Sequence, residues 1–526
     1  MLSRIYSAGT YGIDGYEVTV ECSARDRLGD FQLVGLPDTA VKEAVERVKC
    51  ACENSGYMFP TMDIMVNLAP ANIKKEGSSY DLAILTSIMQ CDGVIPRSLS
   101  FEDKCLLGEL SLSGELRKIS GVLCMTLAAK EMGRKEIFVP TENASEASVV
   151  EGVTVYGVDS FKQLVDHLKG DVALSPTTYD KNKFFSEYGR FDVDFSDVRG
   201  QYVAKRALEV AAAGGHNILL IGPPGSGKSM LAKRIPTILP DMTFDEAIET
   251  TKVHSVMGML KSNLVTERPF RSPHHTVSVA GLVGGGVNPK PGEISLANNG
   301  VLFLDEFPEF GKHIIESMRQ PLEDGVVTVT RVNSRVRYPS SFMMVCAMNP
   351  CPCGYYGDRS NRCTCHPTAI RKYLSKISGP MLDRIDIHVE LPRVSFDDLR
   401  ADTPDGQPSS VIRERVNRAR EIAVKRFEEA GADIKCNAQI PTAKIRKFCR
   451  MELEAEQLLH DVFHKLSMSA RGYDRIVKVA RTIADLDGSD NIKMKHMAEA
   501  VRYRSLDRKY WEYAGNIPKP AQTEEE

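Results

Sequence analysis

The chain has 526 residues, of which 42% are hydrophobic and 26% are charged, so it is long enough for two to four domains with sizeable cores. No run approaches the roughly 18 apolar residues of a membrane-spanning helix. Residues 1–21 alternate like a strand and lack the apolar segment of a signal peptide. We therefore expect a soluble, cytoplasmic protein whose 13 cysteines serve as thiols or metal ligands rather than as disulfides.

Charge is unevenly distributed along the chain, although the net charge is only −3. Residues 1–170 contain 24 acidic and 17 basic residues, whereas the remainder contains 46 acidic and 50 basic residues. A slightly basic remainder permits contact with nucleic acid but does not require it, because a mixed solvated surface gives the same balance.

The first 170 residues mix helical and extended patterns, which predicts an α+β domain. An amphipathic helix is expected to end at Gly56, and an apolar helix and a hairpin with its turn near Ser113 and Gly114 follow. The expected elements are helices at 38–56 and 80–90, the hairpin at 104–117, and strands at 135–140 and 152–158.

From residue 191 onwards, apolar runs lead directly into glycine loops or helices, the pattern of an α/β domain with a buried parallel sheet. The C-terminal region is helical and follows a Pro- and Asp-rich stretch. The predicted divisions are a linker at 171–190, a core at 191–394, a second linker at 395–410, a helical region at 411–512 and a disordered tail at 513–526.

A phosphate-binding loop is predicted at 222–229, where GPPGSGKS follows an apolar strand and precedes a helix. Its glycines let backbone N–H groups face phosphate oxygens, Lys228 is expected to reach the β- and γ-phosphates, and Ser229 is expected to bind Mg²⁺. The candidate ATP-binding residues are Gly222, Pro223, Pro224, Gly225, Ser226, Gly227, Lys228 and Ser229.

Two later apolar runs end in polar residues that suit the same site. VLFLDEF places Asp305 at the end of a strand as a second Mg²⁺ ligand, with Glu306 beside it to orient and deprotonate the attacking water. Asn349, at the end of VCAMNP, is placed to bond the water or the γ-phosphate, or it caps the turn before Pro350.

The segments RPFRSPHHTVSVAGLVGGGVNPKPGEISLANNGVLFLDEFPEF (268–310), NPCPCG (349–354) and SGPMLDRIDIHVELPRV (378–394) closely resemble the YifB/ComM family of magnesium-chelatase-like AAA+ ATPases, over nearly the whole chain. The resemblance implies an AAA+ P-loop core with a parallel sheet and a helical C-terminal lid. It also implies an N-terminal α+β domain like the Lon-protease and S5 fold.

The resemblance assigns roles to three further residues. Asn349 matches the sensor-1 residue, Arg384 matches an arginine finger that acts on the neighbouring subunit's nucleotide, and Arg471 matches the sensor-2 arginine of the lid. A finger in trans implies a homo-oligomeric ring, expected to be a hexamer. On sequence alone, Arg384 pairs locally with Asp383 or Asp386, and Arg471 faces solvent.

Two segments distinguish this branch of the family. The hairpin at 326–339 faces the ring pore in relatives, where Arg331 and Arg335 would grip a DNA backbone; the alternative is a solvated charged hairpin. The insertion at 251–298 contains His274 and His275, which we interpret as part of a pore or interface loop because no ligand partners lie at metal-binding spacing.

The N-terminal domain resembles the Lon protease domain without its catalytic pair. Ser79 falls at the nucleophile, but the lysine position is hydrophobic, near Leu123, and Lys118 lies on the wrong side of Gly121. A Ser–Lys dyad needs an amine to accept the serine proton. We therefore predict that this domain is not a peptidase and serves in binding or assembly.

Four of the cysteines form two CxC pairs just after Asn349, at Cys351, Cys353, Cys363 and Cys365. Four thiolates suit tetrahedral Zn²⁺, with His366 as a spare ligand, although four metal-free thiols remain the alternative. We expect a structural clip beside the ATP site.

The resemblance implies an ATP-hydrolysing motor that remodels or branch-migrates DNA, as ComM-type members suggest for DNA taken up in transformation. The alternatives are a metal-chelatase-type ATPase and a protein-remodelling chaperone, neither of which needs DNA.

Overall fold

The computed structural model describes residues 1–180, 191–260, 262–286, 289–331, 334–357, 362–393, 407–465, 468–504, 506 and 510–511. Most of the two predicted linkers and the whole predicted tail lie outside these residues. Within them, no helix is both long and apolar enough to cross a membrane. The chain forms two compact units, one of residues 1–187, 244–266 and 330–338, the other of residues 188–243, 267–329 and 339–526.

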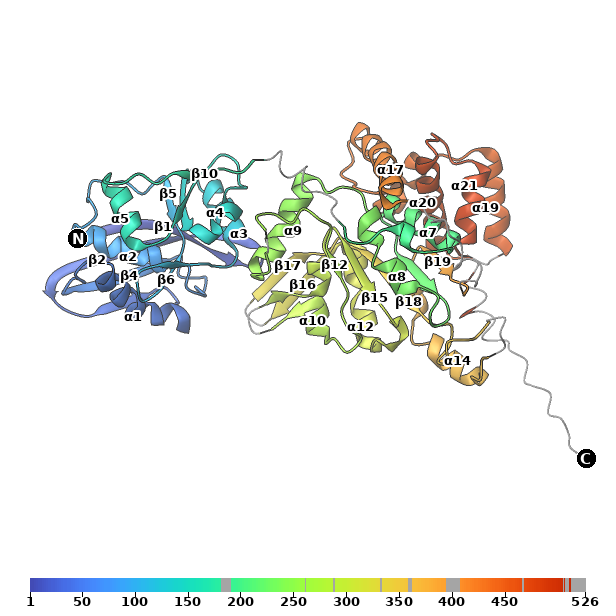
Figure 1. The fold of residues 1–526 in the computed structure, drawn as a ribbon, viewed down its shortest axis with the longest axis horizontal. Coiled ribbons are helices and arrows are strands. Elements are labelled where there is room, and N and C mark those ends of the chain that lie inside the picture. The colour runs from blue at the N-terminus through green and yellow to red at the C-terminus, as the bar shows by residue number, and fades with distance from the viewer. Residues whose placement is uncertain are drawn as a thin grey trace, which may run out of the picture. The chain divides into compact units, whose positions relative to one another are not determined.

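The first unit contains two four-stranded sheets, drawn in blue to green in Figure 1. One has the order β1-β2-β4-β3 and is antiparallel except for its β3–β4 pair; the other has the order β10-β9-β8-β5 and is parallel except for β10. Their strands are β1 (Leu2–Tyr11), β2 (Asp14–Leu28), β3 (Phe31–Val34), β4 (Met62–Ala69), β5 (Lys104–Leu106), β8 (Glu136–Pro140), β9 (Thr154–Val158) and β10 (Pro176–Thr177).

Helices and one small hairpin complete this unit. The first helix starts where the Asp38 side chain accepts the Val41 N–H at 2.8 Å, and the predicted apolar helix is buried along nearly its whole length. The predicted hairpin is present in shorter form, between residues 109 and 117 with Gly114 at φ +85° in its turn, because residues 104–106 instead pair in parallel with β8. The elements are α1 (Thr39–Asn54), α2 (Asp81–Asp92), β6 (Glu109–Leu110), β7 (Leu116–Arg117), α3 (Val122–Glu131), α4 (Thr141–Ala147), α5 (Phe161–Lys169) and α9 (Phe244–Val256).

Helix α9 belongs to this unit although its sequence lies within the predicted core. The Ser255 hydroxyl donates to the buried Glu146 carboxylate at 2.5 Å, and the Leu123 N–H donates to the same oxygen at 3.0 Å. The Gly121 N–H also bonds the Ser255 carbonyl at 3.0 Å. A buried carboxylate with several donors is costly to undo, so α9 is firmly held against α3.

The second unit is built around a five-stranded parallel sheet of order β12-β15-β18-β11-β19 (Figure 1). The three central strands are buried along their whole length, as the continuous apolar runs predict. The five strands are β12 (Phe270–Arg271), β15 (Val301–Leu304), β18 (Met343–Met348), β11 (Ile218–Ile221) and β19 (Ile387–Glu390).

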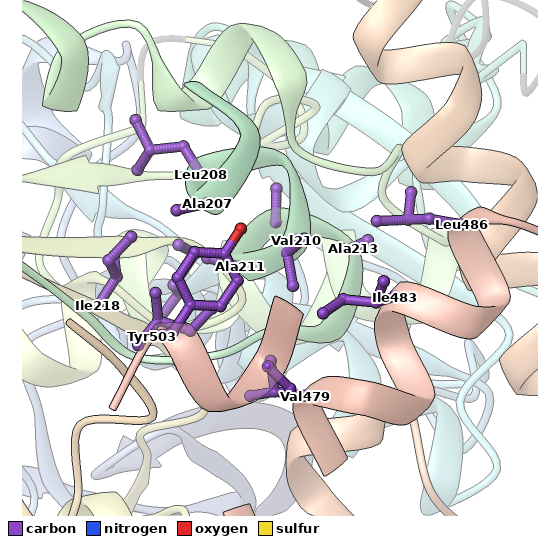
Figure 2. Packing of buried hydrophobic residues seen from close by; sticks show 14 of the residues in the cluster. Ala207, Leu208, Val210, Ala211, Ala213, Ile218, Val479, Ile483, Leu486 and Tyr503 are labelled. Carbon is purple, nitrogen blue, oxygen red and sulfur yellow. The ribbon is translucent and has the colours of Figure 1, made fainter. Parts of the chain in front are cut away.

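Helix α7 joins this sheet to the C-terminal helices. Its Ala207, Val210 and Ala211 lie in one buried cluster with Val479 and Ile483 of α20 (Figure 2). The predicted helical region is present, and α7, α17 and α20 pack against one another. The main helices around this core are α7 (Tyr202–Gly214), α17 (Ser409–Glu429), α18 (Ile445–Phe448), α19 (Leu453–Lys465), α20 (Ala470–Leu486) and α21 (Met494–Arg502).

The remaining elements are short, and β17 falls mostly within the first unit. They are η1 (Phe195–Asp197), α8 (Lys228–Ala232), η2 (Ile235–Ile238), α10 (Val279–Val283), β13 (Gly284–Gly285), β14 (Lys290–Pro291), α11 (Glu293–Leu296), η3 (Phe307–Glu309), α12 (Lys312–Ser317), α13 (Arg319–Asp324), β16 (Val326–Arg331), β17 (Ser334–Pro339), α14 (Pro367–Leu374), α15 (Gly379–Leu382), η4 (Asn437–Gln439) and η5 (Thr442–Lys444).

Candidate nucleotide site

Three strands bring the predicted site residues to one edge of the parallel sheet. The phosphate loop follows β11, Asp305 follows β15, and Asn349 follows β18. The pairing of Ile221 with Met348 aligns the first and third of these strand ends. Since parallel strands end at the same edge of a sheet, the polar residues converge at its carboxyl side.

The phosphate loop has the backbone that a glycine-rich anion site needs. Gly225 and Gly227 have φ of +77° and +88°, a left-handed conformation that L side chains rarely adopt. A Cβ on Gly222 would lie 2.5 Å from the Leu391 carbonyl oxygen, so that position has no room for a side chain. In contrast, a Cβ on Gly225 or Gly227 would meet nothing within 4 Å, so these two glycines are required by their backbone conformation and not by lack of space.

The Lys228 ammonium is held inside the loop. It donates to the carbonyls of Gly222 and Pro223 at 2.7 and 3.0 Å and to Asn349 Oδ1 at 3.2 Å. Burial lowers the pKa of this amine to about 8, while the Asp305 carboxylate opposes the shift. The amine thus occupies a preformed cradle that also contains the predicted sensor residue.

Ser229 and Asp305, the two predicted magnesium ligands, are adjacent. The Ser229 hydroxyl donates to Asp305 Oδ2 at 2.6 Å, and both side chains are half-buried. One hydroxyl and one carboxylate are hard oxygen donors of the kind that Mg²⁺ binds together with nucleotide phosphates. The donor set therefore fits Mg·ATP, with Ser229 and Asp305 to hold the ion and the loop N–H groups and Lys228 to hold the phosphates.

Glu306 projects from this edge into solvent. Its side chain is 60% exposed, and its backbone is left-handed with φ +51°, an uncommon conformation for a glutamate. His275 Nδ1 lies 3.6 Å from Glu306 Oε2. The sequence offered no partner for the histidine pair at metal-ligand spacing, but folding brings one carboxylate, distant in sequence, beside His275.

The four cysteines predicted as a cluster do come together. All four sulfur atoms lie within 4.8 Å of one another, with Cys351 buried and the others half-buried. Cys351 Sγ lies 3.3 Å from Cys353 Sγ and 3.8 Å from Cys363 Sγ. The predicted spare ligand, His366, instead caps α14 by accepting the Thr368 N–H at 3.4 Å.

Hydrogen bonds favour the thiolate form of one of these cysteines, Cys353. Burial opposes the anion, but N–H groups of Tyr355 and Thr364 lower the pKa of Cys353 to about 6 overall. Burial and the neighbouring thiols raise the pKa of Cys363 to about 12. The Tyr356 N–H also points to the sulfur of Cys351 at 3.3 Å. Hydrogen bonds to the ligands of a metal site orient and tune them, and these amide groups could serve that purpose.

The cysteine loop touches the phosphate loop. A Cβ on Gly354 would lie 2.5 Å from Pro224 Cδ, and this glycine has φ +86°. The cluster thus lies against the rim of the nucleotide site, in the place where a structural clip was predicted.

The structure does not bring Arg384 and Arg471 to the phosphate loop of their own chain. Arg384 precedes β19 and so lies at the amino edge of the sheet, where its carbonyl accepts from Asn217 at 2.9 Å. It is 6% exposed and ion-paired with Glu323 of α13, not with the two neighbouring aspartates that sequence alone favoured. Arg471 begins α20, is 61% exposed, and lies 4.0 Å from Glu323.

The hairpin at 326–339 consists of β16 and β17. Val336 and Tyr338 are buried whereas Arg335 and Arg337 are exposed, so β17 alternates between a packed and an open face. Arg331 is the last residue of β16, and its side chain lies outside the described part of the structure.

In the first unit, Ser79 is nearly buried, and Leu123 is fully buried on α3. Lys118 is exposed. The fully buried lysine of this region is Lys75, whose ammonium bonds the carbonyls of Pro70 and Ile73. Burial lowers the pKa of Lys75.

Sequence reasoning missed three residues that contact the predicted site residues. Gln201 donates from Nε2 to the Ser226 carbonyl at 3.1 Å and to the Pro392 carbonyl at 2.7 Å, and so ties the phosphate loop to the end of β19. Glu323 forms an ion pair with Arg384 and lies 4.0 Å from Arg471, and Gly354 packs the cysteine loop against Pro224. No sequence motif identifies Gln201 or Glu323 as important. Gly354 could have been identified, because it is the glycine of the NPCPCG motif.

Comparison with known proteins agrees with this geometry. Family models described as "Magnesium chelatase, subunit ChlI", "Subunit ChlI of Mg-chelatase" and "Magnesium chelatase, subunit ChlI C-terminal" match residues 194–399, 20–143 and 406–504. The chain is 42% identical to "Competence protein ComM" of Haemophilus influenzae and 41% identical to "Uncharacterized protein YifB" of Escherichia coli, each over 96% of this chain and 98% of the relative. It is 39% identical to the YifB protein of Salmonella typhimurium over the same shares. The chain belongs to the YifB/ComM family of magnesium-chelatase-like AAA+ ATPases.

Proposed function

We propose that the protein is an ATP-hydrolysing, ring-forming motor that remodels DNA. The observation that carries the ATPase part is the preformed edge at which Ser229 contacts Asp305 at 2.6 Å and Lys228 contacts Asn349 at 3.2 Å. The site also suits a cytoplasmic protein that meets ATP in a reducing compartment, and all 13 cysteines are free thiols in the structure.

In this proposal each residue has a defined task. The loop N–H groups and Lys228 hold the phosphates, and Ser229 and Asp305 hold the Mg²⁺, which supplies charge neutralisation on the phosphates when bound. Glu306 takes a proton from the water that attacks the γ-phosphate, and Asn349 orients that water. The exposed position of Glu306 leaves room for the water beside it.

The amino-edge position of Arg384 supports a ring. Four paired residues of β11 separate the two edges of the sheet, about 13 Å at 3.3 Å per residue. Arg384 therefore serves the nucleotide of a neighbouring subunit, and Arg471, which shares Glu323 with it, lies on the same side. Arg384 Nε is buried and has no hydrogen-bond partner within the described residues, so this guanidinium has a donor that its own subunit leaves unused.

DNA is proposed as the substrate because of the hairpin. Arg335 and Arg337 lie exposed on one face of β17 and present two guanidinium groups to a phosphate backbone. Arg331 on the paired strand is expected to add a third. A relative that covers nearly the whole chain is named a competence protein. The N-terminal unit, in which Ser79 has no lysine partner among the described residues, is proposed to bind or assemble rather than to cleave peptides.

The cysteine cluster is proposed to hold structural Zn²⁺. Four sulfur atoms within 4.8 Å of one another and amide donors to the sulfurs match the needs of a tetrathiolate site. A bound ion would stabilise the cysteine loop, which packs against Pro224 of the phosphate loop at Gly354.

The alternative is a chelatase-type or protein-remodelling ATPase, which the three chelatase family models favour. One experiment separates these functions: ATP turnover and oligomer size measured without DNA and with single-stranded, duplex and forked DNA. The DNA-motor proposal predicts a several-fold rise in turnover with at least one form. ATP turnover by a well-formed ring that no DNA form changes would favour the alternative.

A further inference from the structure

The parallel pairing of β12 and β15 directs His275 towards Glu306. Arg271 pairs with Leu302, a separation of 31 residues, and the same separation relates His275 to Glu306. Both side chains lie beyond the ends of their strands, at the carboxyl edge of the sheet. The 3.6 Å approach of His275 Nδ1 to Glu306 Oε2 is thus made at the edge where this strand pair ends.

The loop that carries His275 is anchored on both sides. At its start, Arg271 forms a two-point ion pair with Glu293, with distances of 2.6 and 2.7 Å. Further on, the His275 ring packs edge-on against Phe310, a nearly buried residue, with ring centroids 6.4 Å apart. The His274 ring lies 4.1 Å from the His275 ring. The Arg271–Glu293 ion pair and the contact with Phe310 therefore hold His275 in place.

Glu306, in contrast, needs an external restraint on its side chain, which is 60% exposed. Its backbone is held, because its N–H donates to Asp305 Oδ1 at 2.9 Å and its carbonyl accepts from the Glu309 N–H at 2.7 Å. A free glutamate side chain samples many rotamers, and a general base works only when it is held within hydrogen-bond reach of its proton. His275 is the basic side chain that the structure places beside the Glu306 carboxylate, at 3.6 Å.

We infer that His275 is a positioning residue for ATP hydrolysis: it holds the Glu306 carboxylate towards the attacking water and takes no part in proton transfer. The inference rests on the proposed ATPase function. It also gives the SPHHT segment, which lies between β12 and α10 within the insertion at 251–298, a role that its sequence did not indicate. Movement of that insertion would shift His275 and so change the orientation of the base.

The test compares ATP hydrolysis by the full-length wild type and three variants under saturating and limiting ATP. His275→Ala removes the contact, and His275→Asn keeps an N–H donor near the position of Nδ1. His313→Ala makes the same deletion at an exposed histidine on α12 and serves as the matched control. Binding of a fluorescent ATP analogue is measured in parallel, because a positioning role predicts a change in kcat without a change in nucleotide affinity.

The expected result is a fall in kcat of about tenfold for His275→Ala, part of the roughly 10²–10⁴-fold that a positioned general base contributes. KM and analogue affinity stay at the wild-type value, His275→Asn recovers most of kcat, and His313→Ala resembles the wild type. An unchanged or raised kcat in His275→Ala, or a loss of nucleotide affinity equal to the loss of kcat, would overturn the inference while the ATPase function stands. If the wild type hydrolyses ATP no faster than Lys228→Ala, both the inference about His275 and the proposed ATPase function are overturned.

Discussion

Asp386 links the amino edge of the sheet to the helix that carries Arg471. Removal of its charge should lower the free energy of unfolding by an amount that the structure predicts. Its carboxylate accepts from the Asn217 N–H at 3.3 Å, lies 3.2 Å from His216 Nδ1, and lies 3.5 Å from Arg475 Nε on α20. Burial opposes the charged form, but His216 and Arg475 outweigh it and lower the pKa of Asp386 from 3.8 to about 2. Asp386→Asn retains the shape and removes the charge.

The change in the pKa of Asp386 on folding gives the expected loss of stability. A fall in pKa from 3.8 to about 2, at about 1.36 kcal/mol for each pKa unit, corresponds to about 2 kcal/mol of stability at neutral pH. The folded pKa is the lower one, so this stabilisation is present above pH 3.8 and is lost as the pH falls towards 2. Wild type and Asp386→Asn should therefore differ at about pH 7 and converge near pH 2.

The assay is urea unfolding of full-length wild type and variant at several pH values, followed by circular dichroism. Because the chain has two compact units, the transition that involves the second unit is the one to compare. Asp383→Asn, three residues earlier at the end of α15, is the control and should change the unfolding midpoint little. Equal unfolding midpoints for wild type and Asp386→Asn at neutral pH, or a difference that grows as the pH falls, would refute the reasoning.

Three further predictions concern the ring, the metal and the hairpin. Lys228→Ala and Arg384→Ala should each lose about 10³-fold or more in ATP turnover, and a mixture of the two should regain turnover because each supplies the half-site the other lacks. Purified protein should contain about one zinc per chain by elemental analysis, and Cys353→Ser should lose most of it. The double substitution Arg331→Ala/Arg335→Ala should abolish stimulation by DNA and change DNA-free turnover by less than about twofold.

Each of these has a control and a contrary outcome. If the mixture of Lys228→Ala and Arg384→Ala turns over ATP no faster than either variant alone, Arg384 does not act on the nucleotide of a neighbouring subunit. Cys50→Ser, at a half-buried thiol on α1, should retain the zinc, and fully folded metal-free wild type would discard the metal site. Arg418→Ala, which removes an exposed charge from α17, should keep the DNA stimulation; equal loss in this variant would point to bulk charge rather than to the hairpin.

The parts of the fold that sequence predicted well have strong local signals. Continuous apolar runs identified the three central strands, and the glycine pattern of the phosphate loop fixed the conformation around Gly225 and Gly227. The convergence of Asp305 and Asn349 on this loop followed from one rule, that parallel strands share a carboxyl edge. The two CxC pairs likewise sufficed to predict that four sulfur atoms meet.

The rest depends on contacts between residues far apart in sequence. Glu323 lies 61 residues before Arg384 and still further from Arg471, so no spacing rule relates it to either arginine. The grouping of α9 with the first unit depends on Glu146, which is 109 residues from Ser255. His275 was set aside because its carboxylate partner is 31 positions away, a separation that has meaning only once the register of β12 and β15 is known.

The central claim, ATP hydrolysis at the edge formed by β11, β15 and β18, is tested most directly by turnover and nucleotide binding in one set of proteins. We predict that wild type binds and hydrolyses ATP, that Glu306→Gln binds ATP with near wild-type affinity but fails to hydrolyse it, and that Lys228→Ala loses hydrolysis together with most of its affinity. Hydrolysis by Glu306→Gln at the wild-type rate would contradict the claim.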